Sequence, residues 1–358
     1  MSSRIRIAVV YGGRSSEHSI SCISAGAIRR ALDPQRYDVV SIGITREGGW
    51  FLQHTDPRDM RILNGVLPEV LPNDEPVTFH ADPTLVDDLI GSIDVVFPVL
   101  HGPYGEDGTV QGLFELAGIP YVGSGVLSSA VAMDKGYMKA LFAAAGLGVG
   151  PYAVITDHQW RTDEAGCRAR IAELGFPLFV KPARAGSSQG ITKVHSGEEL
   201  DGAIAEARLH DPRLVIEAGI EGVREIECAV MVDAQGVARA SRCAEIIVRS
   251  GHEFYDFSAK YLEDAADLVV PADIPEAVES RMRELAVVAF EALGCEGLAR
   301  VDFFLLRDGS VVVNEVNTMP GFTPISMFPR MWAESGIGYE QLVDSLVADA
   351  LRRGTGLR

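Results

Sequence analysis

The chain has 358 residues, 47% of them hydrophobic, which is enough for two or three domains, each with its own core. Its formal net charge of −18 argues against nucleic-acid or anionic-membrane partners, so a polyanionic small ligand must be bound by a local cluster of cations. The five cysteines are widely spaced and form no Cys-x-x-Cys pair, so neither a zinc site nor a disulfide framework is predicted. The N-terminal apolar run is too short for a signal peptide and no stretch resembles a membrane span, so we expect a cytoplasmic protein.

The first third of the chain alternates apolar strand patterns with helical patterns, as is typical of a parallel α/β sheet. Residues 54–84 carry many Pro, Asp and Asn residues without a clear period, and we expect them to form a surface excursion. The predicted strands are 5–10, 39–44 and 93–99, and the predicted helices are 24–32 and 110–117.

Two further blocks follow along the chain. The second block is predicted to be a small antiparallel α+β unit. Its elements are a helix at 135–145, a break at 146–151, and strands at 177–182, 215–217 and 224–232. The third block is predicted to contain the strands 244–249, 298–306 and 310–316 around a long helix at 275–293.

A loop rich in glycine and serine, Ala-Arg-Ala-Gly-Ser-Ser-Gln-Gly at 183–190, follows a predicted strand that carries Lys181 near its end. Such a loop can turn several backbone N–H groups toward phosphate oxygens. Its spacing is not that of a P-loop, so a nucleotide would be bound by a hairpin between two strands. An ordinary turn between strands is the alternative interpretation.

The two predicted strands at 298–306 and 310–316 give the clearest indication of a functional site. Side chains alternate between faces along a strand, so Arg300 and Asp302 share one face, as do Glu315 and Asn317. If these strands pair, Asp302, Glu315 and Asn317 converge as oxygen donors, a set that suits magnesium with positions left for phosphate. Arg300 would then be a fixed cation that stabilises an oxyanion. The alternatives are a solvated acidic hairpin and a surface salt bridge for Arg300.

Three other segments concentrate polar or aromatic side chains. Glu17 follows the first predicted strand, where α/β sheets bind ligands, although a charged first helical turn is the alternative. His101 lies in the loop Leu-His-Gly-Pro-Tyr-Gly-Glu-Asp-Gly after the third strand, where a structural histidine is the alternative. Residues 253–261 combine three aromatic side chains with Lys260 and Tyr261, which indicates a closing lid or an amphipathic surface loop.

Seven motifs occur in order: Glu-His-Ser, His-Gly-Pro-x-Gly-Glu-Asp-Gly, Met-Asp-Lys, Lys-Pro-x-Arg-x-Gly-Ser-Ser, Phe-Tyr-Asp-Phe-x-Ala-Lys-Tyr, Arg-Val-Asp and Asn-Glu-Val-Asn-Thr-Met-Pro-Gly. Together they resemble the D-alanine–D-alanine ligases of the ATP-grasp superfamily. The resemblance implies an ATP-grasp fold, α/β plus α+β, with an N-terminal Rossmann-like parallel-sheet domain and domains at 1–132, 133–222 and 223–358. It also implies a homodimer that joins two D-alanines to D-alanyl-D-alanine through D-alanyl phosphate, for peptidoglycan precursor synthesis.

The resemblance also implies a role for each matching residue. The ATP site would comprise Lys135, Lys181, Ser187, Ser188, Glu217, Glu225 and Lys260. Two Mg²⁺ ions, with Mn²⁺ as the alternative ion, would be bound by Asp302, Glu315 and Asn317. The catalytic set would comprise Glu17, His101, Ser187 and Tyr261 around the first D-alanine, Ser326 at the carboxylate of the second, Lys260 at the γ-phosphate, and Arg300 with the N–H of Gly321 as the oxyanion hole.

Other functions fit part of this pattern. Another ATP-grasp ligase of a carboxylate and an amine, or a ligase that uses D-lactate or D-serine, would share the ATP and metal motifs. Tyr261 is the form similar to dipeptide-forming members of the family, which favours an amine as the second nucleophile. A nucleotide-binding dehydrogenase is disfavoured because the Gly-x-Gly-x-x-Gly fingerprint is broken, and a non-catalytic ATP sensor because Arg300 accompanies the metal set.

Overall fold

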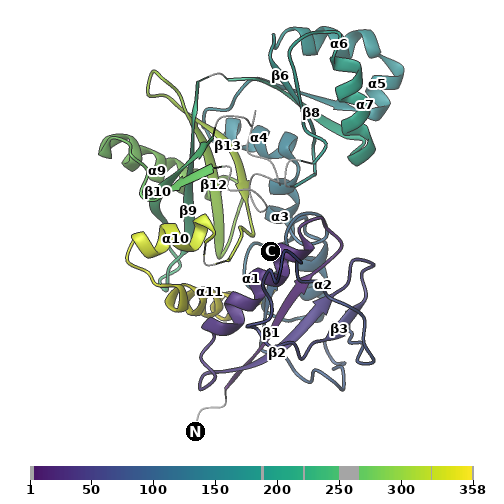
Figure 1. The fold of residues 1–358 in the computed structure, drawn as a ribbon, viewed down its shortest axis with the longest axis vertical. Coiled ribbons are helices and arrows are strands. Elements are labelled where there is room, and N and C mark those ends of the chain that lie inside the picture. The colour runs from purple at the N-terminus through teal and green to yellow at the C-terminus, as the bar shows by residue number, and fades with distance from the viewer. Residues whose placement is uncertain (1–3, 187–188, 221, 250–265, 324, 357–358) are drawn as a thin grey trace.

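The computed structural model describes residues 4–186, 189–220, 222–249, 266–323 and 325–356, and contains three sheets (Figure 1). The N-terminal sheet has the order β3-β2-β1-β4, with β1 parallel to both β2 and β4 and the short β3 antiparallel at the edge. The predicted parallel α/β sheet is therefore confirmed. Its elements are β1 (Ile5–Gly12), α1 (His18–Ala31), β2 (Tyr37–Ile44), β3 (Trp50–Leu52), β4 (Val95–Val99) and α2 (Thr109–Ala117).

Two features of the N-terminal unit differ from the sequence prediction. Helix α1 begins at His18 rather than at residue 24. The serines of its first turns are buried, although their polar character predicted no helix face toward the core. The Ser21 hydroxyl, for example, accepts from Gly12 N at 2.7 Å and donates to Val99 O. The segment 54–84 has the predicted irregular backbone, but it is not merely a surface excursion. It buries apolar side chains, including Met60, Val70, Val77 and Phe79, against the sheet and helix α1.

The central sheet is antiparallel, with the order β5-β8-β6-β7. Helices cover one of its faces through a core that contains Ile155, Leu178, Ile204 and Leu214. Its elements are β5 (Tyr152–Thr156), α5 (Asp157–Thr162), α6 (Glu164–Ala172), β6 (Leu178–Pro182), β7 (Thr192–Val194), α7 (Leu200–His210) and β8 (Arg213–Ala218).

The C-terminal sheet has the order β11-β10-β9-β12-β13. The strand at 224–232, predicted to lie in the second block, is instead the central strand of this sheet. Its side chains are buried on both faces, with Cys228 in one core and Ala229 in another, and it pairs with β10 on one edge and β12 on the other. The elements are β9 (Arg224–Val232), β10 (Ala238–Val248), β11 (Ala266–Val269), α9 (Glu276–Ala292), β12 (Leu298–Leu305), β13 (Val311–Asn317), α10 (Met327–Glu334) and α11 (Tyr339–Arg353).

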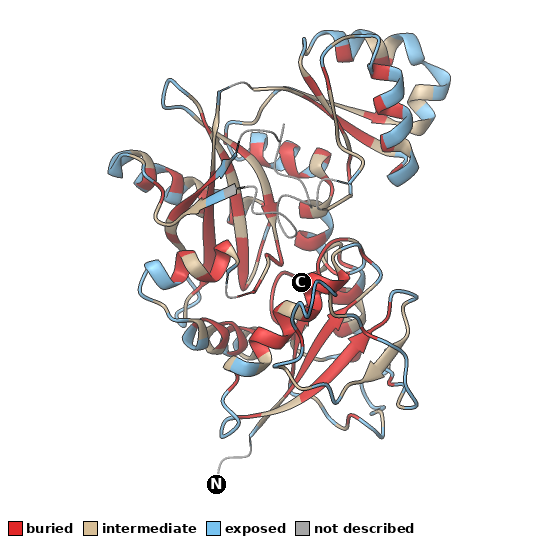
Figure 2. Cartoon of the chain, viewed as in Figure 1, coloured by how far each residue is buried: buried red, intermediate tan, exposed pale blue. Residues whose placement is uncertain are grey.

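Two helices connect the N-terminal sheet to the central sheet. They are α3 (Val126–Met133) and α4 (Lys135–Ala144), and both pack against β13 of the C-terminal sheet. Buried residues concentrate in the sheets and on the helix faces that cover them (Figure 2). In the part of the chain that the structure describes, no helix has both the length and the apolar character of a membrane span.

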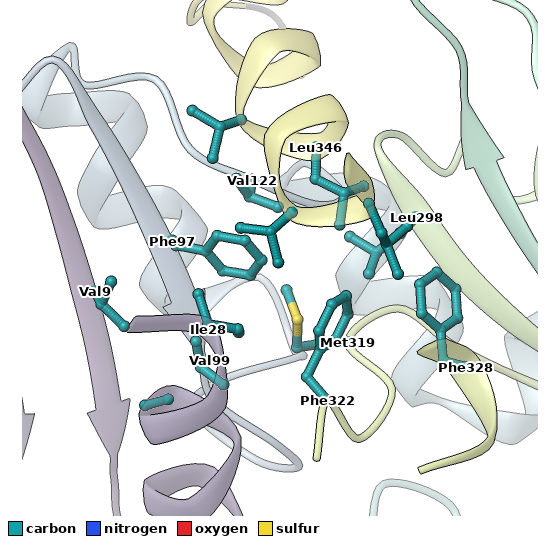
Figure 3. Packing of buried hydrophobic residues seen from close by; sticks show 14 of the residues in the cluster. Val9, Ile28, Phe97, Val99, Val122, Leu298, Met319, Phe322, Phe328 and Leu346 are labelled. Carbon is teal, nitrogen blue, oxygen red and sulfur yellow. The ribbon is translucent and has the colours of Figure 1, made fainter. Parts of the chain in front are cut away.

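One apolar cluster joins the N-terminal sheet to the C-terminal sheet (Figure 3). Phe97 of β4 contacts the ring of Phe322 with centroids 6.0 Å apart, and the N–H of Phe322 donates to the Ser24 hydroxyl at 3.2 Å. Tyr339 of α11 donates its hydroxyl to the carbonyl of Phe322 at 2.6 Å. The loop after β13 is thereby anchored between the two sheets. This anchoring fixes the position of the polar residues that precede and follow Phe322.

Candidate active site

A cavity of about 560 Å³ lies where the three sheets meet. It is lined by every predicted site residue that the structure describes, although these residues come from distant parts of the chain. Ser187, Ser188, Lys260 and Tyr261 lie outside the described residues. The predicted residues in the lining are Glu17, His101, Lys135, Lys181, Glu217, Glu225, Arg300, Asp302, Glu315, Asn317, Gly321 and Ser326.

The predicted pairing of the two acidic strands is confirmed. β12 and β13 are antiparallel, with Arg300 opposite Asn317 and Asp302 opposite Glu315. Arg300 donates from two nitrogens to the two oxygens of Asp302, each at 2.7 Å, and also lies 3.2 Å from a carboxylate oxygen of Glu227. Burial opposes the charge of Arg300, but Asp302 and Glu227 outweigh it and hold its pKa well above the ordinary value. Arg300 is therefore a fixed cation.

The donor set of this strand pair fits a hard divalent cation. Asp302 and Glu315 offer carboxylate oxygens, and Asn317 adds an amide whose nitrogen donates to Asp302 at 3.0 Å. Among the described residues, no group of three or more His, Cys, Asp or Glu side chains is arranged to hold a metal. Two carboxylates and one amide form an incomplete cage, which is the kind of site that shares a magnesium ion with phosphate oxygens.

Two lysines also line the cavity, and the ammonium of Lys135 lies 3.9 Å from a carboxylate oxygen of Glu315 on β13. Lys181 of β6 lies 2.6 Å from a carboxylate oxygen of Glu217 on β8. Lys135 is the first residue of α4, where the Asp134 side chain accepts from two backbone N–H groups of the first turn. The ammonium of Lys135 donates to the carbonyl of Ala185 at 2.9 Å. Both cations therefore border the loop that the sequence marked as a phosphate-binding candidate.

At the N-terminal side of the cavity, Glu17 is enclosed by two glycines. A Cβ built on Gly186 would lie 3.0 Å from Oε2 of Glu17, and one on Gly102 would lie 3.2 Å from the same atom. His101 donates from Nδ1 to the carbonyl of Met319 at 2.8 Å, because a carbonyl can only accept. Burial lowers the pKa of His101, which favours a neutral ring. Glu17 therefore presents a carboxyl group to this end of the cavity.

Ser326 and Gly321 form the third part of the lining. The Ser326 hydroxyl accepts from the N–H of Thr323 at 3.1 Å and lies 2.7 Å from the Thr323 hydroxyl. A Cβ on Gly321 would lie 3.0 Å from the Ser326 hydroxyl oxygen, so only glycine leaves this approach open. Ser326 also directly precedes α10 as its N-cap residue. The two positions therefore lie side by side at the start of a helix.

Comparison with known proteins identifies the protein family of this chain. The family model for the N-terminus of D-ala D-ala ligase matches residues 6–124, and the model for the C-terminus matches residues 141–348. The chain belongs to the D-alanine–D-alanine ligase family. This membership confirms the resemblance, the ligase class and the ATP-grasp fold that the motifs predicted.

Similar proteins of this ligase family span nearly the whole chain. The D-alanine–D-alanine ligase of Arthrobacter sp. (strain FB24) is 56% identical, covering 99% of this chain and 96% of the relative. The crystal structure of the VanG D-Ala:D-Ser ligase from Enterococcus faecalis has a TM-score of 0.84 at 38% identity, with 97% and 100% coverage. The structure of the D-alanine–D-alanine ligase from Coxiella burnetii has a TM-score of 0.82 at 35% identity, with 98% and 94% coverage.

The buried Lys139 and the half-buried Glu106 are among the ionisable residues for which no role was predicted. Lys139 of α4 pairs with Glu217, and the only signal in the sequence was its position one helical turn after Lys135. Glu106 lies in the His101 loop, whose density of polar residues was noted without a role for this one. Its carboxylate accepts from the N–H groups of Gly102 and Met319, each at 2.8 Å. Glu106 therefore clamps the His101 loop to the loop after β13.

Replacement Glu106→Gln is expected to remove a pH-dependent contribution to stability. Burial raises the pKa of Glu106 from 4.5 to about 7, against the backbone donors of Gly102 and Met319. The folded state therefore binds the Glu106 proton more tightly than the unfolded chain does. The contribution of this proton to the free energy of unfolding is complete below about pH 4.5 and is lost as the pH rises through about 7. The whole effect is on the order of 3 kcal/mol.

Urea denaturation of the wild type and the Glu106→Gln variant between about pH 4.5 and about pH 8 measures this contribution. The stability of the variant relative to the wild type should increase with pH across that range. A difference that stays constant with pH would contradict the assigned pKa of Glu106.

Proposed function

We propose that this chain joins two D-alanines to form D-alanyl-D-alanine, with ATP converted to ADP and phosphate and Mg²⁺ as the divalent ion. The observation that carries the proposal is a single cavity that gathers the two lysines, the Arg300 strand pair and the Glu17, Gly321 and Ser326 region. These are a site for phosphate groups, a site for a reacting centre and a site for a zwitterionic amino acid. A nucleotide-binding dehydrogenase or a non-catalytic ATP sensor would not need all three.

The residues support a two-step reaction. A carboxylate oxygen of the first D-alanine attacks the γ-phosphorus of ATP, the bond to the bridging oxygen breaks, and ADP leaves with its electron pair. Lys135 and Lys181 bind the phosphate chain and lower its repulsion toward the carboxylate. Bound by Asp302, Glu315 and Asn317, Mg²⁺ would neutralise phosphate charge. Glu17 binds the ammonium of the first D-alanine and so orients its carboxylate.

In the second step, the unprotonated amine of the other D-alanine attacks the acyl carbon. Phosphate leaves with the electrons of the acyl C–O bond and takes up the proton that the nitrogen loses as the amide forms. Arg300 and the N–H of Gly321 stabilise the negative oxygen of the tetrahedral intermediate. Ser326 receives the carboxylate of the attacking D-alanine, since its hydroxyl lies beside Gly321. The predicted lid, residues 253–261, would exclude water, as would the loop that contains Ser187 and Ser188.

The family resemblance supports three further parts of the proposal. We infer domain limits at 1–132, 133–222 and 223–358, a homodimer, and a role in peptidoglycan precursor synthesis. Helix α4, which falls in the second of these domains, packs against β13 and α9 of the third. A truncation that tests the central domain must therefore preserve the apolar contacts of this helix.

The direct test is phosphate release with ATP and Mg²⁺, with products identified by mass. D-alanine alone should give D-alanyl-D-alanine, and L-alanine should give no turnover. D-serine and D-lactate, each mixed with D-alanine, test the alternative second substrates, because a D-Ala:D-Ser ligase is among the similar structures. Turnover with another carboxylate and amine but none with D-alanine would contradict the substrate assignment and keep the ligase mechanism.

A further inference from the structure

Lys139 is a buried lysine for which the proposed reaction has no use. It lies on α4, its side chain is 4% exposed, and its ammonium lies 3.1 Å from Oε1 of Glu217. The ammonium of Lys181 lies 2.6 Å from Oε2 of the same residue. Each oxygen of the Glu217 carboxylate therefore has its own cation. One acid with two lysines is an unusual arrangement for a buried site, because each desolvated charge has a cost.

The two lysines differ in their access to the cavity. Lys181 and Glu217 line it, whereas Lys139 is not part of the lining and lies behind Glu217. The ammonium of Lys139 also lies 5.9 Å from the centre of the Tyr152 ring. A ligand in the cavity can therefore attract Lys181 but not reach Lys139.

The charges around Glu217 show why this carboxylate needs a second cation. Burial opposes the charge of Glu217, but Lys181 and Lys139 outweigh it and lower its pKa to about 2. Lys181 is also attracted by Glu315 and Glu225 from the C-terminal sheet. If Lys181 leaves for a phosphate oxygen and nothing replaces it, a buried carboxylate loses its partner, which strongly destabilises the bound state.

We propose that Lys139 is the permanent counter-ion of Glu217, which keeps that carboxylate charged and in place while Lys181 moves from it to a phosphate of the nucleotide. The inference rests on the proposed function, since it requires that Lys181 binds phosphate. Lys139 is then a positioning residue, and its charge matters more in the nucleotide complex than in the free protein.

The test is the binding of ADP with Mg²⁺ to the full chain, measured by calorimetry in buffers of different ionisation enthalpy at neutral pH. Lys139→Met should weaken ADP binding about tenfold to a hundredfold. It should also add up to one proton taken up per ADP relative to the wild type, because Glu217 becomes protonated when Lys181 leaves it. Lys139→Arg keeps the charge and should bind ADP with the proton number of the wild type.

The same Lys139 substitution in a variant without the Glu217 carboxylate distinguishes an effect of the Lys139 charge from an effect of its packing. In the Glu217→Gln variant there is no carboxylate to compensate, so adding Lys139→Met should change neither ADP affinity nor the proton number further. Lys139→Gln serves as the second uncharged variant if thermal melting shows that Lys139→Met does not fold.

Two results would overturn the inference. One is wild-type affinity and proton number in the uncharged Lys139 variants. The other is an equal loss of affinity with and without Glu217, which would indicate packing alone. A wild-type chain that fails to bind ADP would overturn the proposed function itself, and the inference with it.

Discussion

Replacement Arg300→Ala is expected to lower kcat for dipeptide formation by about 10²–10³-fold, the usual effect of removing one oxyanion donor. Arg300 is buried, held by a two-bond contact with Asp302 and by Glu227, so it is already oriented before the charge of the intermediate develops. The affinity for ADP should change far less than kcat, because the proposed phosphate contacts lie on Lys135 and Lys181. Steady-state phosphate release and ADP calorimetry measure the two quantities.

The control for Arg300 must account for its ion pairs. Without the arginine, Asp302 and Glu227 lose a buried cation, which makes the cavity more negative and alters attraction for a divalent ion. Assays at saturating Mg²⁺ remove this indirect effect. Arg300→Lys keeps the charge but not the planar guanidinium group, so its kcat should lie between those of Arg300→Ala and the wild type. Near-normal kcat in Arg300→Ala would show that the oxyanion assignment is wrong.

Replacement Lys181→Met is expected to weaken ADP binding roughly tenfold to a hundredfold, since a hydrogen bond to a charged group contributes about 1.5–3 kcal/mol. Burial opposes the charge of Lys181, but Glu217 outweighs it and raises its pKa, so the lysine is protonated at neutral pH. Glu217 retains Lys139 in this variant, and the fold should persist. Calorimetry with ADP and Mg²⁺, alongside thermal melting, measures both effects.

Lys193→Met is the matched control for Lys181. Lys193 lies on β7, next to the strand of Lys181, and also lines the cavity. Its loss should affect ADP binding much less, because the proposal assigns the phosphate contact to Lys181. If both variants weaken binding equally, the cavity attracts ADP through its general charge, and the specific role of Lys181 is refuted.

The local parts of the site could be predicted from the sequence. Strand alternation placed Arg300 with Asp302 on one face and Glu315 with Asn317 on one face of its own strand. The pairing of β12 with β13, which are joined by a short turn, then brings the two pairs together. The parallel N-terminal sheet also followed from the alternation of strand and helix patterns. In both cases the information lies within a short stretch of chain.

The parts that were missed depend on distant contacts. Glu106 receives its N–H donor from Met319, 213 residues away in sequence, and no periodicity encodes that distance. Lys139 lies on helix α4 and its partner Glu217 lies on β8, and a lone lysine in a helical sequence is normally expected to face solvent. The assignment of the strand at 224–232 to the second block was wrong for the same reason, because an apolar strand pattern does not specify which strands pair with it.

The most direct test of the account follows oxygen from the substrate into phosphate. If D-alanine attacks ATP through its carboxylate, one carboxylate oxygen remains on phosphorus when the acyl C–O bond breaks. With D-alanine labelled by ¹⁸O in both carboxylate oxygens, each phosphate released should carry one ¹⁸O atom. Dipeptide formation with unlabelled phosphate would contradict the acyl phosphate and with it the roles proposed for the cavity.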